Sequence, residues 1–405
     1  MGEIATRETE WIEETLVPKI AQRFGLKAEN VRCSISFPEN CFFISYVCFV
    51  DLEFDKSIKT VGRNSEKQLK LVIKKLPLNP LLVKELKLVK QFHNEILFYT
   101  KFASGNPRFP RCIHTDNDTT EDSVIVTENL STQGFSICPQ THNIPTEYIF
   151  SAVKEIGKLH AIAYVMKERE SERFYNIVSA IQEPRLNPDA EWFDKYVNII
   201  ATRPIDWLRR NNYDKEFCNK LEKHLGNGFE EIMLYAKRPV EPIATLCHGD
   251  FTRNNIFFRN INGKLESKLF DFALITYSSP AIDLSTFLYL NCSADDRIGK
   301  FNEIYRAYHD TVMEHLRDSG IKDLDKYSHD KMLADYKRRA AFGYMIASFF
   351  MPVMLGFINV DFETIFRDPL AQVPEVMKAG GEFMTEIFAQ MILELKALGS
   401  FDHVI

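Results

Sequence analysis

Three side chains whose oxygen atoms suit a metal ion and a reacting hydroxyl lie close together in the chain: Asp250, Asn255 and Asp271. The first two belong to the segment His-Gly-Asp-Phe-Thr-Arg-Asn-Asn at residues 248–255. A carboxylate can accept the proton of an attacking hydroxyl, and carboxylate and amide oxygens are good ligands for Mg²⁺. This spacing predicts phosphoryl transfer from ATP, with Asp250 orienting the acceptor and Asn255 and Asp271 binding Mg²⁺.

A predicted hairpin connects these residues. The apolar residues 256–258 predict a strand, and Asn262 and Gly263, which both tolerate positive φ, predict a tight turn. Residues 265–270 should then return antiparallel to the first strand. The hairpin would carry Asp271 back beside the start of that strand.

The motif distinguishes among kinases. Protein kinases carry H-R-D-x-x-x-x-N followed by D-F-G, whereas Gly249 stands here in place of the arginine and Ala273 in place of the last glycine. His-Gly-Asp-x-x-x-x-Asn resembles instead the motif of choline kinases and aminoglycoside phosphotransferases. Asn254 and the segment Ser-Pro-Ala-Ile-Asp-Leu at 279–284 narrow the resemblance to the ecdysteroid-kinase-like family, also called CHK kinase-like. The resemblance runs from about residue 30 to the C-terminal helices.

This resemblance implies a two-lobed protein-kinase-like fold of the α+β class. The expected N-terminal lobe, residues 1–130, is a small antiparallel sheet with a helix and binds the nucleotide. The expected C-terminal lobe, residues 131–405, is mainly helical and holds the catalytic loop, the metal site and the acceptor pocket. The resemblance also implies ATP and Mg²⁺ as cofactors. The expected acceptor is an alcohol on an apolar body, such as an ecdysteroid or a xenobiotic.

A kinase-like first lobe needs a strand lysine near the nucleotide phosphates and a helix glutamate that holds this lysine in place. Lys74 lies in the predicted strand 69–76, and Glu95 lies in the predicted helix 92–99. We therefore expect Lys74 and Glu95 to form this pair. Lys75 is the alternative, because the phase of the strand cannot be fixed from the sequence.

The stretch 123–130 predicts a strand that runs into a polar turn, and it resembles the hinge between kinase lobes. The backbone from Glu128 to Leu130 is expected to hydrogen-bond the adenine edge. Asn129 is a mild departure, since the resembling family often has Glu-Asp here.

Three further residues are expected to support the site rather than to react. His248 should pack and hydrogen-bond within the catalytic loop. His160, on the apolar stripe of a predicted helix, should be a satisfied core histidine. Asp283 is expected to cap a helix that begins near Leu284 and to brace the metal loop.

One departure from the family pattern favours a rival interpretation. The expected nucleotide loop, residues 36–43, contains no glycine, and Pro38 and Cys41 stand where family members commonly have other residues. A catalytically silent, ligand-binding pseudokinase is therefore an alternative. The presence of Asp250, Asn255 and Asp271 in one chain favours activity.

A choline or ethanolamine kinase is a second alternative, and it would need an anionic or aromatic cage for a cationic substrate. No acidic cluster stands out in the sequence. Aromatic residues are frequent in the second lobe, and most should pack in the core while a few line an acceptor pocket. They include Trp192, Phe193, Tyr196, Trp207, Tyr336, Phe342, Tyr344, Phe349 and Phe350.

Composition is that of an ordinary globular protein, with 405 residues, 45% hydrophobic and 26% charged. A net charge of −6 without a basic block argues against nucleic acid as a partner. The eight cysteines lack zinc-site spacing and indicate buried thiols in a reducing compartment. With no signal-peptide pattern at the N-terminus, we expect a cytoplasmic protein without an obligate protein partner.

Two apolar segments complete the prediction. Residues 6–24 should form an amphipathic helix, kinked or split at Pro18, that packs on the first lobe. Residues 340–360 carry no charge and are long enough to span a membrane. Polar and helix-breaking residues within this stretch favour a buried pair of helices meeting near Pro352 instead, so no membrane span is expected.

Overall fold

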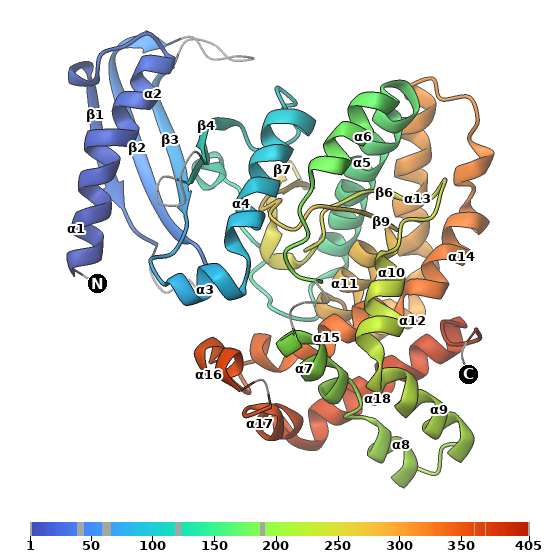
Figure 1. Cartoon of the computed structure of the whole chain (residues 1–405). Coiled ribbons are helices and arrows are strands. Elements are labelled where there is room, and N and C mark those ends of the chain that lie inside the picture. Colours follow the sequence, from blue (N-terminus) through green and yellow to red (C-terminus); the bar gives the residue numbers. More distant parts are fainter. Residues whose placement is uncertain are drawn as a thin grey trace. The chain divides into compact units, whose positions relative to one another are not determined.

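The structure is a computed structural model that describes residues 2–38, 44–58, 66–117, 123–186, 191–359, 361–368 and 370–403. The chain forms two compact units, Met1–Ser136 and Ile137–Ile405 (Figure 1). The first contains an antiparallel sheet and the second is mainly helical, so the predicted α+β class is confirmed.

Five antiparallel strands form the sheet of the first unit, in the order β1-β2-β3-β5-β4. Their bounds are β1 Val31–Ser36, β2 Tyr46–Ile58, β3 Glu66–Lys75, β4 Cys112–Asp116 and β5 Val124–Glu128. Successive side chains of a strand point to opposite faces of a sheet. On β3, Leu71 and Ile73 therefore join the core under the N-terminal helix, while Lys74 points to the other face.

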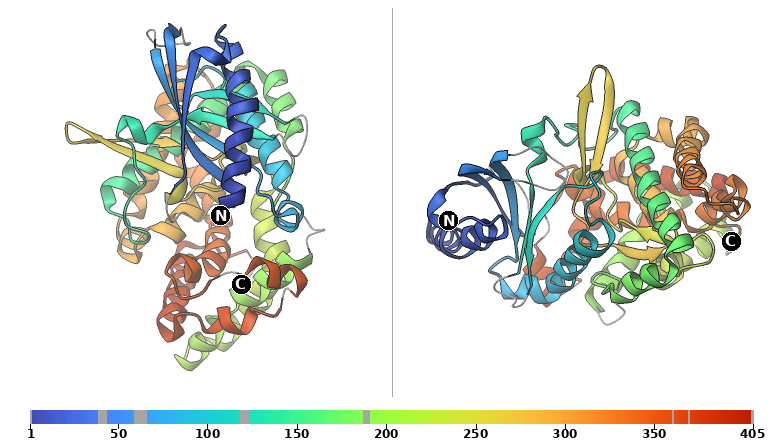
Figure 2. Two further views of the ribbon diagram at one scale, coloured as in Figure 1. Left: turned by 90° about the vertical axis from the view of Figure 1, so that its left-hand side faces the viewer. Right: turned by 90° about the horizontal axis from the view of Figure 1, so that it is seen from above.

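The N-terminal helix predicted at residues 6–24 is present as α1 and α2, joined by a π-helical turn. The helical segments of this unit are α1 Gly2–Trp11, the π-helical Ile12–Leu16, α2 Val17–Arg23, α3 Pro80–Glu85 and α4 Leu88–Leu97. Pro18 lies in the first turn of α2, directly after the π-helical turn. Ile12, Leu16 and Ile20 are buried against strands β1 to β3, and both views in Figure 2 show α1 and α2 lying along the sheet.

A buried ion pair connects this helix to β3. Lys75 Nζ lies 2.7 Å from Glu8 Oε2, and both side chains are only 7% exposed. The same ammonium lies 3.5 Å from the centroid of the Trp11 ring. Lys75 thus points toward the N-terminal helix, and Lys74, one residue earlier, points away from it.

Helices and two small two-stranded sheets make up the second unit. The strands are β6 Thr245–Cys247, β7 Ile256–Ile261, β8 Lys264–Leu269 and β9 Thr276–Ser278. The helices are α5 Thr146–Arg169, α6 Ser171–Ala180, α7 Glu191–Ala201, α8 Ile205–Arg210, α9 Lys215–Gly226, α10 Tyr235–Lys237, α11 Ala281–Asn291, α12 Ala294–Gly299, α13 Phe301–Asp318, α14 His329–Arg339, α15 Ala341–Met354, α16 Phe362–Arg367, α17 Val373–Lys378 and α18 Gly381–Leu398. β6 pairs with β9, and β7 pairs with β8 in a hairpin that projects from the helices (Figure 2).

Within the uncharged stretch 340–360, residues 341–354 form one helix, α15, so the expected pair of helices meeting near Pro352 is wrong. Pro352 lies in the last turn of α15, and Ala340 separates α15 from the end of α14 at Arg339. A Cβ on Gly343 would lie 2.2 Å from the carbonyl oxygen of Ser285 on α11, which requires glycine at this crossing. Among the described residues, no helix is long and apolar enough to cross a membrane.

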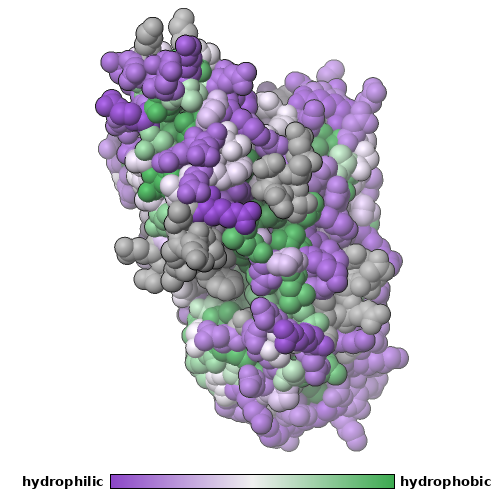
Figure 3. All heavy atoms as spheres, turned by 60° about the vertical axis from the view of Figure 1, so that its left-hand side comes forward, coloured by the Kyte–Doolittle hydropathy of each residue, from purple (hydrophilic) through white to green (hydrophobic). Residues whose placement is uncertain are grey.

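Hydrophilic side chains cover most of the face in Figure 3, with smaller apolar areas between them. The exposed apolar residues include Phe357 and Phe383, whose rings contact each other 6.2 Å apart. The seven cysteines in the described part of the chain are all thiols outside disulfides.

We predict that the buried ion pair of Lys75 with Glu8 depends on both charges being present. Glu8→Gln should lower the free energy of unfolding by about 3 kcal/mol, because it leaves the Lys75 ammonium buried without a counter-charge. Chemical denaturation at pH 7 measures the loss. The double variant Glu8→Leu with Lys75→Met should recover most of it, since apolar residues of similar size replace both charges.

The matched control is the exposed pair Lys70–Asp51, which joins β3 to β2 at 3.1 Å. Asp51→Asn should cost less than about 1 kcal/mol. Equal losses in Glu8→Gln and Asp51→Asn would contradict the special role of the buried pair.

Candidate active site

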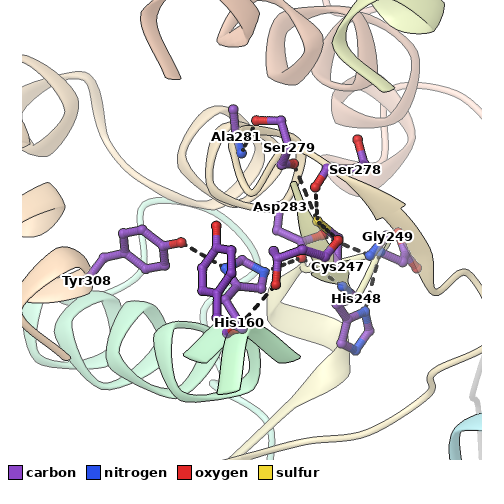
Figure 4. A network of polar contacts seen from close by, with 12 residues as sticks. His160, Cys247, His248, Gly249, Ser278, Ser279, Ala281, Asp283 and Tyr308 are labelled. Atoms are coloured by element: carbon purple, nitrogen blue, oxygen red, sulfur yellow. Dashed lines mark hydrogen bonds and ion pairs between the residues drawn. The ribbon is translucent and has the colours of Figure 1, made fainter. Parts of the chain in front are cut away.

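The buried carboxylate of Asp283 fixes the loop that follows β6. Its Oδ2 accepts the N–H of His248 at 2.7 Å, and its Oδ1 accepts the N–H of Gly249 at 2.8 Å. Nε2 of His160 lies 3.0 Å from Oδ2 on the other side (Figure 4). The expectation that Asp283 caps a helix starting near Leu284 is wrong: α11 begins at Ala281, and Asp283 in its first turn binds the loop instead.

The conformation of this loop also requires glycine at position 249. Its φ is +80°, a conformation that favours glycine, and a Cβ there would lie 1.8 Å from the carbonyl oxygen of Leu274. The glycine that replaces the arginine of the protein-kinase motif is therefore demanded by close packing of two backbone segments.

His248 connects the loop to the segment that holds Asp271. Its Nε2 lies 3.0 Å from the carbonyl oxygen of Phe270, and its Nδ1 accepts the N–H of Asp250 at 3.3 Å. A carbonyl can only accept and an amide N–H can only donate, so the imidazole is neutral with its proton on Nε2. The predicted structural role of His248 is confirmed.

The β7–β8 hairpin brings Asp271 to the site, as the sequence predicts. Its turn residues Asn262 and Gly263 have φ of 51° and 81°. At the open end, the N–H of Phe270 donates to the carbonyl of Asn255 at 3.1 Å. Asp271 follows directly, with a φ of 62° that turns the chain sharply.

Asn255 and Asp250 are joined through the amide of Asn255. Its Nδ2 donates to the backbone oxygen and to Oδ2 of Asp250, each at 2.9 Å. Since both partners are acceptors, the nitrogen of the amide must face them and the oxygen must face away. This orientation leaves Oδ1 of Asn255 as the atom available to a cation.

Asp250 is partly buried, with 37% of its side chain exposed. Burial raises the pKa of this carboxyl above its ordinary value, and Arg185 opposes the rise. The negative charge of Asp271 also raises the pKa of this carboxyl.

Arg185 was not predicted from the sequence. Its Nη2 donates to the carbonyl of Gly249 at 2.9 Å, and its Nη1 lies 3.8 Å from Oδ1 of Asp250. The residue comes from the irregular segment 181–186 after α6, which carries no motif or periodic pattern. Only the tertiary fold brings it to the loop.

Lys74 and Glu95 are brought together within the first unit. Lys74 Nζ lies 2.7 Å from Glu95 Oε2, and the glutamate side chain is 5% exposed. Lys75 is instead bound to Glu8, which removes the alternative left open by the sequence.

Glu128 and Leu130 lie at the end of β5. The Glu128 N–H donates to the carbonyl of Arg111 at 2.9 Å, and the Asn129 N–H donates to that of Lys70 at 2.8 Å. Leu130 is buried and begins a 3₁₀ turn. Any adenine contact by a backbone N–H of this stretch would therefore fall to Leu130.

The glycine-free loop expected at residues 36–43 lies largely outside the described residues, which omit 39–43 and with them Cys41.

Within the described part of the chain, a second group of side chains is of the types that bind metals. His160, Cys247 and Asp283 bring ligand atoms within 4.8 Å of one another, and all three are buried. Each already has protein partners: His160 Nδ1 lies 2.9 Å from the Tyr308 hydroxyl, and the Cys247 thiol donates to the Ser279 carbonyl at 3.4 Å (Figure 4). The cluster is structural, and the prediction for His160 is confirmed.

The antiparallel sheet unit and the mainly helical unit with its His-Gly-Asp loop define a kinase-like protein. A family model described as the Ecdysteroid kinase-like family matches residues 42–321, and the chain belongs to this family. The predicted resemblance is thus confirmed, and membership supports a small-molecule kinase. A search of curated proteins gave no match.

Solved structures with similarity to the chain include three small-molecule kinases. An ethanolamine kinase of Plasmodium vivax has 13% identity and a TM-score of 0.46, with 92% of this chain and 84% of that chain covered. A type VIII aminoglycoside-3′-phosphotransferase has 15% identity and a TM-score of 0.35, with 79% and 98% covered. A microcompartment-associated aminopropanol kinase has 11% identity and a TM-score of 0.38, with 93% and 98% covered.

Asp283→Asn should destabilise the protein by about 3 kcal/mol, because an amide NH₂ would replace one oxygen that now accepts a buried N–H. Thermal and chemical unfolding measure this change. Asp310→Asn, on the exposed side of α13, is the control and should leave stability unchanged. Similar unfolding curves for the two variants would refute the assigned role of Asp283.

Asp250→Asn should stabilise the fold near neutral pH. Because the folded-state pKa of Asp250 is raised, its ionisation disfavours the folded state, and this cost grows as pH rises through that pKa. The gain in Tm should therefore be larger at pH 7 than at pH 4. Asp330→Asn, at a fully exposed carboxyl, should show no such trend; a gain independent of pH would contradict the prediction.

Proposed function

We propose that this protein transfers the γ-phosphate of ATP to the hydroxyl of a small apolar alcohol, such as an ecdysteroid or a xenobiotic. The observation that carries the proposal is the convergence of Asp250, Asn255 and Asp271. Backbone bonds of Phe270 to both His248 and Asn255 bring them together.

Asp250 is the proposed catalytic residue. Its carboxylate would accept a hydrogen bond from the acceptor hydroxyl, orient the oxygen for attack and take the proton. Asn255 holds this carboxylate through its amide nitrogen, at 2.9 Å from Oδ2.

Asn255 and Asp271 would hold Mg²⁺. The donor set fits this ion, because it combines one amide oxygen turned outward with one carboxylate at the open end of the hairpin. When bound, the ion neutralises charge on the nucleotide phosphates. The hydrogen bond from the Phe270 N–H to the Asn255 carbonyl holds the two ends of the hairpin, and so the two proposed ligands, close together.

In the first unit, Lys74 would contact the nucleotide phosphates while Glu95 keeps its ammonium in place. Glu95 is almost fully buried, so it restricts Lys74 to one rotamer better than an exposed carboxylate would. Leu130 and Glu128 would lie along the adenine. For each of these residues the proposal draws on the kinase pattern.

A small pocket beside Gly249 has room for only about one water molecule, so it cannot itself hold a sterol, but its walls show which side chains surround the loop. Its walls include the apolar side chains of Leu186, Leu274, Ile282 and Phe342, and Phe342 is one of the aromatic residues considered for an acceptor pocket. The charged lining groups are Arg185 and the ion pair of Lys237 with Glu183. Arg185 faces Asp250 and adds a positive charge next to the proposed base, which disfavours a cationic acceptor such as choline.

The test is Mg²⁺-dependent transfer of labelled γ-phosphate from ATP to ecdysteroids, plant sterols and phenolic alcohols, with choline and ethanolamine as competitors. We expect transfer to one class of apolar alcohol, without competition by the two cations. Asp250→Asn should lower kcat at least about 100-fold, since it removes the proton acceptor.

Two results would overturn the proposal. Absence of transfer together with absence of Mg·ATP binding would favour the pseudokinase. Preferential transfer to choline or ethanolamine would establish the other alternative. Asp206→Asn, at an exposed carboxyl on α8, serves as the control and should retain full activity.

A further inference from the structure

We propose that Arg185 is a positioning residue, which fixes the peptide between Gly249 and Asp250 and aims the Asp250 carboxylate at the acceptor. The inference rests on the proposed kinase function of the same site. Its basis is the set of hydrogen bonds and ion pairs made by the polar atoms of residues 248–250.

Asp283 and Asn255 hold part of the loop. Asp283 accepts the N–H groups of His248 and Gly249, and Asn255 donates to the backbone oxygen and to Oδ2 of Asp250. None of these bonds involves the carbonyl of Gly249 or Oδ1 of Asp250. Arg185 faces both of them, with Nη2 at 2.9 Å from the carbonyl and Nη1 at 3.8 Å from Oδ1.

The two nitrogens of one planar guanidinium can face two acceptors at once, which the single ammonium of lysine cannot do with the same geometry. The bridge therefore couples the orientation of the Asp250 side chain to the backbone of the residue before it. Asn255 hydrogen-bonds one carboxylate oxygen, and the Arg185 guanidinium forms an ion pair with the other.

Arg253, the arginine within the motif, cannot make these contacts with Gly249 and Asp250. Arg253 is buried and points inward, where Nη2 donates to Oδ1 of Asn254 at 2.7 Å and Nη1 donates to the carbonyl of Cys138. The cation beside Asp250 must therefore come from a distant segment.

That segment is itself held in place. Oε1 of Glu183 accepts the N–H of Arg185 at 2.9 Å and that of Leu186 at 2.7 Å. Oε2 of Glu183 pairs with Lys237 at the end of α10. The Arg185 side chain is 19% exposed, so its position is set by packing as well as by these bonds.

The test compares Arg185→Met and Arg185→Lys with the wild type in the phosphotransfer assay. Arg185→Met should lower kcat about 10- to 100-fold, because a small misplacement of the base is enough to do so, while KM for Mg·ATP stays within about twofold. Arg185→Lys should be intermediate. Arg209→Met, at an exposed ion pair on α8, is the control and should keep full activity.

A double-variant cycle tests whether Arg185 acts through Asp250. In the Asp250→Asn background, Arg185→Met should have little further effect on kcat. An equal loss in both backgrounds would overturn the proposal and indicate a direct contact of Arg185 with substrate or phosphate.

Amide hydrogen exchange of residues 246–255 gives a readout that does not depend on turnover. Arg185→Met should speed exchange in this loop without changing exchange in the β7–β8 hairpin turn. Unchanged exchange and unchanged kcat would refute the proposal while leaving the kinase function intact. A wild type without transfer would refute the kinase function, and the exchange result would still decide whether Arg185 positions the loop.

Discussion

The arrangement of the site depends on one buried carboxylate. Asp283 accepts two successive backbone N–H groups of the loop that follows β6 and faces His160 on α5. A carboxylate has only acceptor atoms, so it can satisfy all three donors at once, which no neutral side chain of that size can do. The loop can therefore pass close to Leu274, at a distance that only glycine allows at position 249.

The loop that Asp283 holds in turn positions the two ends of the β7–β8 hairpin. His248 and Phe270 bind the loop to the end of the β7–β8 hairpin, and the next residue is Asp271. Asn255 stands at the start of the hairpin and reaches back to Asp250. Hydrogen bonds within one unit thus connect the segments that carry the three proposed functional residues.

Ion pairs with buried glutamates likewise hold two side chains of the sheet unit in place. Neighbouring lysines on β3 point to opposite faces, and each has a nearly buried glutamate as partner. Lys74 takes the partner on α4, and Lys75 takes the one on α1. The family match begins at residue 42, yet α1 and α2 supply core residues and this second pair, so the N-terminal helix is an integral part of the unit.

The sequence by itself determined the family, the fold class and the hairpin that carries Asn255 and Asp271 at its open end, because motif spacing and turn chemistry are local properties. Asn262 and Gly263 specify the turn wherever the hairpin lies, and the turn brings Asp271 to Asn255. Only the tertiary structure decided between Lys74 and Lys75, since that choice depends on which helix covers which face. It also decided the roles of Asp283 and Arg185, because their partners are distant in the chain and hydrogen bonding between distant segments leaves no periodic signal.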